Sequence, residues 1–264
     1  WSDERKEEAH QKALEFYKTC DDPAMFGEMM GFTEFHQKGL ETGEWHGYSG
    51  VGFFLTPREG GHIQAHMQHS SQVPYVLTDD AWDLTKGEIE CRKQNAMAIR
   101  FFRKYIPGFE NAYMTRMCPE MRLREGRRIM GDYKLTRDDV AVGQEFPDVI
   151  GKSHFKAGAH HTVDKNTIAQ VEKVCPQDGG SYDIPYRCLV PLEVENMLVA
   201  GKHVSTDRDA YLRYLHQTMV TGQAAGAAAA LCVKNGISPR EMEKDVSELQ
   251  KVLKEQGAII DGTH

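Results

Sequence analysis

A basic segment near the middle of the chain, RLREGRRIM, has the residue types and spacing to bind an anion. Side chains alternate between the two faces of an extended strand, so Arg124, Gly126 and Arg128 would share one face and Arg127 the other. Two guanidinium groups beside a glycine could clamp a carboxylate through paired hydrogen bonds. The alternative is a solvated basic edge whose arginines pair with nearby carboxylates such as Glu125.

A second candidate cluster lies in DAYLRYLHQTM, where Arg213 and His216 are three positions apart and would share one face of a helix. The pKa of an imidazole lies near neutral pH, so His216 could donate or accept a proton. A half-buried histidine that only packs and hydrogen-bonds is the alternative. Adjacent His160 and His161 would point to opposite sides of an extended segment, so no metal site is predicted there. We expect one of the three histidines His154, His160 and His161 to face the active site.

The segment LHQTMVTGQAAGAAAALCV predicts a helix whose small side chains allow another backbone or a flat ligand to approach closely. It follows an apolar run, Met197 to Ala200, which predicts a buried strand ending at Gly201. We expect the first helical turn to carry Thr218, Thr221 and Gly222 and to direct free backbone N–H groups at one point. Such groups suit the N1 and C2-carbonyl edge of a reduced flavin, which carries negative charge. The alternative is a helix packed tightly against a sheet.

Five motifs in chain order cover roughly residues 80 to 235. Three of them, WDLTKGEIECRKQ, YIPGFENAYM and RLREGRRIMGDYKLTRDDV, resemble the substrate-side region of a family of FAD-dependent oxidoreductases related to the succinate dehydrogenase and fumarate reductase flavoproteins. The other two, IPYRCLVPLEVENMLVAGKHVS and TGQAAGAAAAL, are similar to the closing segment of that family. The combination is far more specific than any one motif.

The resemblance implies FAD as the cofactor and an α/β (mixed α+β) fold. It implies a substrate or cap region over residues 1–182, the second half of a GR2-type FAD-binding domain over 183–237, and a carboxyl-terminal docking helix over 238–264. Arg213 matches an arginine of the family and is assigned to the substrate or the flavin. The candidate catalytic residues are Arg213, His216, Arg128 and Arg124. The candidate cofactor-binding residues are Gly201, Lys202, Ser205, Thr221, Gly222, Gln223 and Ala224.

The chain departs from the family in three ways. Gly126 stands where the family usually has serine, and Lys202 where it usually has arginine. The sequence also has no GxGxxG motif after a strand, so the phosphate-binding half of the dinucleotide fold is absent. We therefore expect a polypeptide that carries this half, either a partner subunit or a portion preceding Trp1.

The activity implied by the resemblance is hydride transfer between flavin N5 and a small organic substrate that is anionic or contains a carbonyl group. The alternative is a noncatalytic structural or regulatory subunit of a heteromeric complex that retains the flavoprotein fold. The missing phosphate-binding half and the apolar, methionine-rich segment from Met25 to Phe35 favour taking this alternative seriously.

Composition narrows the classes of protein further. A net charge of −7 argues against nucleic-acid binding, and no apolar run is long enough to span a membrane. Six cysteines without a CxxC pair argue against a zinc ribbon and a disulfide scaffold, so a reducing, cytoplasmic setting is expected.

Local patterns predict the elements that position these residues. Helical spacing over residues 3–19 and 84–106 predicts two helices, the second with a capping box at Thr85 and Glu88. Extended runs around Gly60 predict a hairpin over 49–69, and alternation predicts a strand over 121–136. Two further sets of cap residues predict helix starts, at Thr136 with Asp139 and at Ser238 with Pro239 and Glu241.

Overall fold

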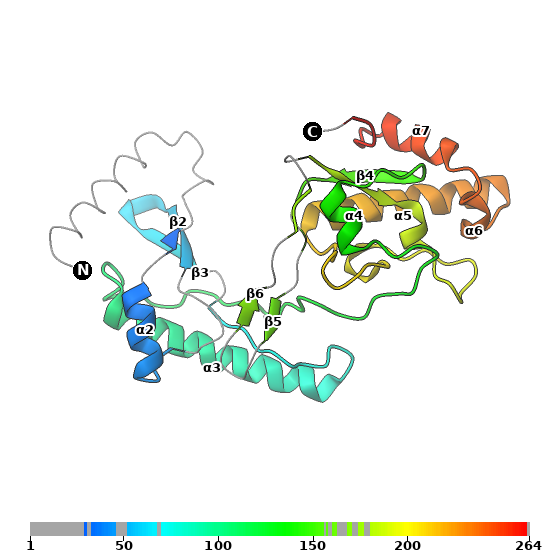
Figure 1. Cartoon of the computed structure of the whole chain (residues 1–264). Coiled ribbons are helices and arrows are strands. Elements are labelled where there is room, and N and C mark those ends of the chain that lie inside the picture. Colours follow the sequence, from blue (N-terminus) through cyan, green and yellow to red (C-terminus); the bar gives the residue numbers. More distant parts are fainter. Residues whose placement is uncertain are drawn as a thin grey trace. The chain divides into compact units, whose positions relative to one another are not determined.

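A computed structural model describes most of the chain, and Figure 1 shows the order of its elements. The described residues are 29–30, 33–45, 52–67, 70–155, 157, 160–162, 168–170, 174–176 and 180–262. The helix predicted over residues 3–19 lies outside them, as does most of the segment from Met25 to Phe35. The chain divides into two compact units: unit 1 takes the described residues within 1–76, 82–121 and 164–168, and unit 2 those within 77–81, 122–163 and 169–264.

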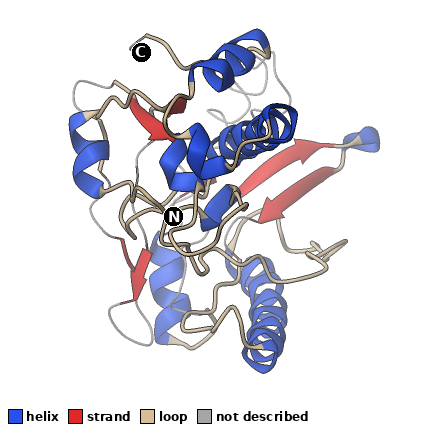
Figure 2. Cartoon of the chain, turned by 90° about the vertical axis from the view of Figure 1, so that its right-hand side faces the viewer, coloured by secondary structure: helices blue, strands red, loops and turns tan. Residues whose placement is uncertain are grey.

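Unit 1 contains a three-stranded antiparallel sheet and two helices. Its strands are β1 (Met29–Met30), β2 (Gly52–Pro57) and β3 (Ile63–Met67), and its helices are α2 (Thr33–Glu41) and α3 (Ala81–Tyr105), whose first residue falls in unit 2. The predicted hairpin is confirmed: β2 and β3 are joined by the 3-10 turn η2 (Glu59–Gly61), and Gly60 turns the chain with a φ of 77° (Figure 2). The buried core of this unit is largely aromatic and includes Trp45, Phe53, Phe101 and Phe102.

The predicted capping box at Thr85 is wrong, because α3 begins one turn earlier at Ala81. Asp80, a residue type favoured at the N-cap, immediately precedes that helix. Within α3, Gln94 is buried, and its side chain accepts a hydrogen bond from the backbone N–H of Gln72 at 2.8 Å. This contact ties the extended segment before the helix to the helix itself.

Unit 2 is built around an antiparallel strand pair and the long helix α5. The strands are β4 (Val149–Ser153) and β7 (Tyr182–Pro185), and the helices are α4 (Arg137–Val142), α5 (Leu215–Asn235), α6 (Pro239–Met242) and α7 (Ser247–Glu255). Two 3-10 turns, η4 (Tyr186–Leu189) and η5 (Gly201–His203), lie between β7 and α5. A separate antiparallel pair joins β5 (His160–Thr162) to β6 (Ile168–Gln170).

Helix α5 packs against β4 and α7, and its small side chains allow a close approach to the strand (Figure 1). Ala224, Ala228 and Leu231 line its buried side. A Cβ on Gly151 of β4 would collide with the side chain of Val220 on the helix, so a larger residue there would force Val220 to shift. Ala224 and Ala228 are fully buried on the side of α5 that packs in the core, in line with the close packing predicted for the alanines.

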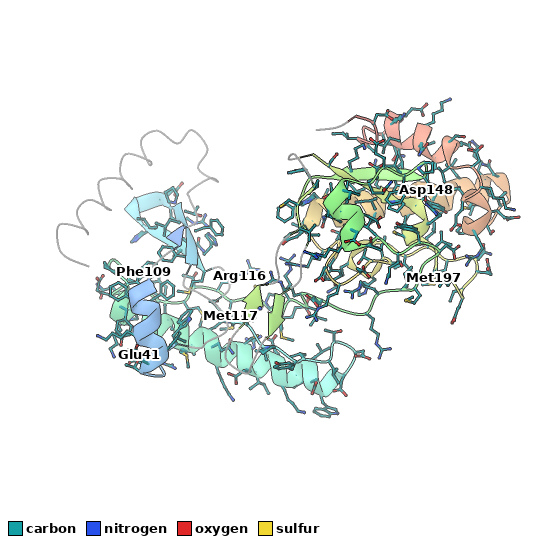
Figure 3. The ribbon with its side chains drawn as sticks, viewed as in Figure 1. Glu41, Phe109, Arg116, Met117, Asp148 and Met197 are labelled. Carbon is teal, nitrogen blue, oxygen red and sulfur yellow. The ribbon has the colours of Figure 1, made fainter. Side chains whose placement is uncertain are left out.

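An ion pair anchors the turn after β7 to the residue before β4. Asp148, labelled in Figure 3, is buried and accepts hydrogen bonds from Arg187 Nε at 2.9 Å and Nη2 at 3.1 Å. The guanidinium of Arg187 also lies over the ring of Tyr133, 5.0 Å from its centroid. These contacts hold η4 beside the segment that leads into α4.

Two predicted strands are absent from the described residues. Residues 121–130 are extended without a strand ladder, and only isolated bridges at Gly131 and Leu135 pair this segment with its neighbours. Met197–Ala200 also forms no strand: Met197, labelled in Figure 3, is 44% exposed, and Val199 donates one backbone hydrogen bond to Leu189. An apolar run becomes a buried strand only where neighbouring strands pair with it and cover it. Among the described residues, no strand pairs with Met197–Ala200.

The predicted helix starts at Thr136 and Ser238 are confirmed, each with its complete capping box. The amphipathic segment predicted after Ser238 is broken into α6 and α7, and α7 ends at Glu255, close to the predicted end near Gly257. The mixed α/β class is confirmed. The domain boundaries at residues 182 and 237 stay predictions.

Candidate functional site

The amino end of α5 gathers most of the predicted site residues of unit 2. The helix begins at Leu215, and the backbone N–H of Thr218 already bonds to the carbonyl of Tyr214 at 2.9 Å. Thr221 and Gly222 therefore lie in the second turn, which corrects the prediction that they open the helix. The first N–H groups of an α-helix have no carbonyl acceptor within the helix. In α5 these groups begin at Leu215, so they lie one turn before Gly222.

Arg213 precedes the helix, so the prediction that it shares a helix face with His216 is wrong. Its guanidinium lies over the ring of Tyr214, 4.5 Å from the centroid, and Nη2 donates to the Tyr214 hydroxyl at 3.2 Å. The buried Nε atom of Arg213 has no hydrogen-bond partner among the described residues. One donor of this arginine is therefore left for another group.

The other arginines separate into two environments. Burial lowers the pKa of Arg124, and the charge of Arg213 lowers it further, so these two guanidinium groups lie close enough to repel each other. Arg128 lies over the ring of Tyr211, 4.9 Å from its centroid. Arg127 points away into solvent and forms an ion pair with Asp79. The structure thus brings Arg124 to Arg213, which lies far from it in the sequence.

Three rings lie together at the start of α5. The ring centroids of Phe155 and Tyr214 are 4.1 Å apart, and that of His216 lies 5.3 Å from Phe155 and 6.0 Å from Tyr214. His216 is exposed on the surface, but the groups packed beside it partly desolvate the imidazole and lower its pKa, and the neighbouring His154 lowers it further. The imidazole is therefore neutral at pH 7 and able to accept a proton. Here Phe155, Tyr214 and His216 are called the ring cluster.

Gln217 was not predicted as a site residue, although it holds the start of α5. Its side chain is buried and bonds to the backbone N–H of Tyr214, to the Ser153 hydroxyl and to the Tyr182 hydroxyl. A glutamine at the third position of a helix is a capping-box residue, so this signal was present in the sequence. The strand partners were not predictable, because they come from β4 and β7.

The predicted cofactor-binding residues lie on the turn before α5 and on its second turn. Gly201 has a φ of 74°, which favours glycine, and its N–H donates to the Thr221 hydroxyl at 2.9 Å. Lys202 donates to the carbonyl of Leu123 at 2.7 Å, and burial followed by the charge of Arg122 lowers its pKa.

The remaining cofactor candidates differ in exposure. Ser205 is fully buried, and its hydroxyl has no partner in the part of the chain that the structure describes. Ala224 is fully buried in the core, whereas Gly222 lies on the exposed side of α5. Gln223 bonds to the side chain of Gln256 at 3.1 Å. Of these four residues, Gly222 presents bare backbone to the surface.

One exposed side of α5 carries only apolar residues. They are Leu215, Met219, Gly222, Gly226, Ala229 and Val233. Cβ atoms added at Gly222 and Gly226 would meet no heavy atom of the described residues within 4 Å. No side chain projects at these two glycines, so the helix backbone is accessible there, between the exposed side chains of Met219 and Val233. The diphosphate of FAD has no corresponding glycine-rich cradle in this sequence.

The described residues offer neither a metal site nor a membrane-spanning helix. No group of three or more His, Cys, Asp or Glu side chains there is placed to hold a metal ion. None of the described helices combines the length and the apolar character that crossing a bilayer requires.

Comparison with known proteins adds one positive finding. The family model of the FAD dependent oxidoreductases matches residues 5–253, which is nearly the whole chain. Neither a curated protein nor a solved structure matches this chain. FAD is the cofactor of that family. The chain belongs to the FAD-dependent oxidoreductase family.

Proposed function

We propose that this chain forms the ring side of the flavin site in an oxidoreductase that transfers a hydride between flavin N5 and a small organic substrate. The observation that carries the proposal is the order of features on α5. The ring cluster and Arg213 lie at its amino end, and the bare backbone of Gly222 follows one turn later. Bound FAD supplies the hydride chemistry, and the chain supplies orientation and charge.

Arg213 and Arg124 are the proposed contacts for an anionic or carbonyl group of the substrate. Burial lowers the pKa of Arg124, and the charge of Arg213 lowers it further; a negative charge between the two guanidinium groups would offset both effects. The Arg213 Nε atom, which has no partner among the described residues, provides a donor for such a group. His216, whose lowered pKa favours the neutral form, would accept the companion proton.

The diphosphate of FAD requires a second binding element, which we propose is a GxGxxG-bearing half supplied by a partner polypeptide or by a preceding portion of the same protein. The absence of that motif from this sequence supports the proposal. The exposed apolar side of α5 supports it as well, because an apolar helix face is normally covered by another layer.

Flavin content tests the proposed function directly. The chain is co-expressed with the protein encoded beside it, the complex is purified, and bound FAD is measured by absorbance and by release on denaturation. We expect one FAD per complex and loss of that FAD in Gly222→Leu. The fold of the variant should remain intact, because nothing among the described residues lies near this position. Arg213→Met should keep FAD and lose binding of small carboxylates, measured by calorimetry.

A colourless complex of full stoichiometry would contradict the oxidoreductase proposal and favour the noncatalytic subunit. Unchanged FAD content in Gly222→Leu would instead remove α5 from the flavin site. Ala230→Leu is the matched control on the same helix, since Ala230 is exposed but lies outside the apolar side defined above and should not affect FAD content.

A further inference from the structure

Gln217 joins three segments that meet at the amino end of α5. Its side-chain oxygen accepts the backbone N–H of Tyr214 at 3.2 Å. Its amide nitrogen donates to the Ser153 hydroxyl at 3.1 Å and to the Tyr182 hydroxyl at 3.0 Å. The residue is 1% exposed, so these bonds form away from bulk water, where an unmade hydrogen bond is costly.

The two hydroxyl partners of Gln217 also hold Phe155. The backbone N–H of Phe155 donates to Ser153 Oγ at 3.3 Å, and its carbonyl accepts the Tyr182 hydroxyl at 3.4 Å. Gln217 therefore acts on both sides of the ring cluster: it holds Tyr214 directly and Phe155 through two hydroxyl groups. His216 contacts both of those rings.

The backbone of Gln217 extends the same network toward the predicted flavin turn. The hydroxyl of Thr221 lies within donating distance of the carbonyls of Gln217, at 3.2 Å, and Thr218, at 3.0 Å, and its oxygen accepts the N–H of Gly201 at 2.9 Å. The start of α5, the ring cluster and the turn at Gly201 are thus fixed by one continuous set of hydrogen bonds.

We propose that Gln217 is a positioning residue that sets the placement of the ring cluster, and of Arg213 beside it, for the chemistry of the proposed site. This inference rests on the proposed function for its significance, but its geometry is that of the chain alone. The residue touches neither substrate nor flavin in this proposal and acts through Tyr214 and Phe155. A glutamine whose only role is to stabilise the helix would not control the environment of His216.

Titration of the His216 side chain by NMR tests the proposal without any cofactor. Gln217→Met keeps the length of the side chain and removes all three of its polar contacts. We expect the ring cluster to loosen and the pKa of His216 to rise from its lowered value toward the ordinary 6.5. Among the described residues, the groups facing this imidazole are His154, Tyr214 and Phe155.

Tyr182→Phe, which keeps the ring and removes one partner, gives a milder change in the direction of Gln217→Met and serves if Gln217→Met fails to fold.

Gln250→Met is the matched control. Gln250 also uses its side-chain amide to bond twice to the segment of β4, at the carbonyls of Pro147 and Val149. Gln250→Met should therefore lose its bonds to the same strand segment while leaving the His216 titration unchanged. A folded Gln217→Met or Tyr182→Phe with an unchanged His216 pKa would overturn the proposal, as would an equal shift in Gln250→Met. If the complex failed to bind FAD, the proposed function would be contradicted. The titration of His216 would still test the role of Gln217, because it requires no cofactor.

Discussion

Substitution of Gly222 should stabilise the chain while weakening its hold on FAD. Gly222 lies inside an exposed stretch of α5, and a Cβ there would meet no described atom within 4 Å. Glycine in a helix interior is less favourable than alanine by about 1 kcal/mol, chiefly because it loses more backbone entropy on folding. Gly222→Ala should therefore raise the free energy of unfolding by about 1 kcal/mol.

Urea denaturation measures the effect. With a denaturant slope of about 2 kcal/mol per molar urea, the unfolding midpoint should rise by about 0.5 M. Hydrogen exchange of the α5 amides assigns the gain to this helix. Gly201→Ala is the contrasting variant: it also meets open space, but a φ of 74° costs alanine about 1 kcal/mol or more, so the midpoint should fall. A loss of stability in Gly222→Ala would show that this side of α5 is already covered in solution and would refute the reasoning.

Two further predictions concern the charged groups of unit 2. Lys152 Nζ lies 2.6 Å from Asp183 Oδ1 in an ion pair whose side chains are 7% and 3% exposed. Removal of one partner leaves the other charge buried and unpaired, so Lys152→Met should lower the free energy of unfolding by about 3–5 kcal/mol. Urea denaturation measures this loss. A loss below about 1 kcal/mol would show that water reaches the pair. Burial followed by the neighbouring Asp132 raises the pKa of Glu243 from 4.5 to about 7. The protonated form is therefore favoured on folding, and the stability that it contributes is present below pH 4.5 and lost as the pH rises through 7. The difference in melting temperature between the native chain and Glu243→Gln should change over that interval, and a constant difference would contradict this assignment.

Local signals predicted two helix starts and one hairpin, although the capping box expected at Thr85 was wrong. The helix starts at Thr136 and Ser238 were predicted correctly, because a capping box is completed within one turn. The hairpin around Gly60 was predicted for the same reason, since glycine tolerates the positive φ that the turn requires. The family motifs, spread over much of the chain, were sufficient to predict FAD.

The tertiary structure alone decided which distant residues meet. Arg124 comes to lie near Arg213, and Phe155 near His216, because the segments that carry them pack together across long separations in sequence. Met197–Ala200 reads as a buried strand in the sequence but remains without a ladder among the described residues, because pairing depends on a neighbour and not on the run itself. The sequence by itself determined the cofactor, the long small-residue helix and its tolerance of close packing. Only the folded chain decided that the first turn of that helix carries Gln217 beside the ring cluster and that Gly222 follows one turn later. The reason is that the start of the helix is fixed by hydrogen bonds from Gln217 to Ser153 of β4 and Tyr182 of β7.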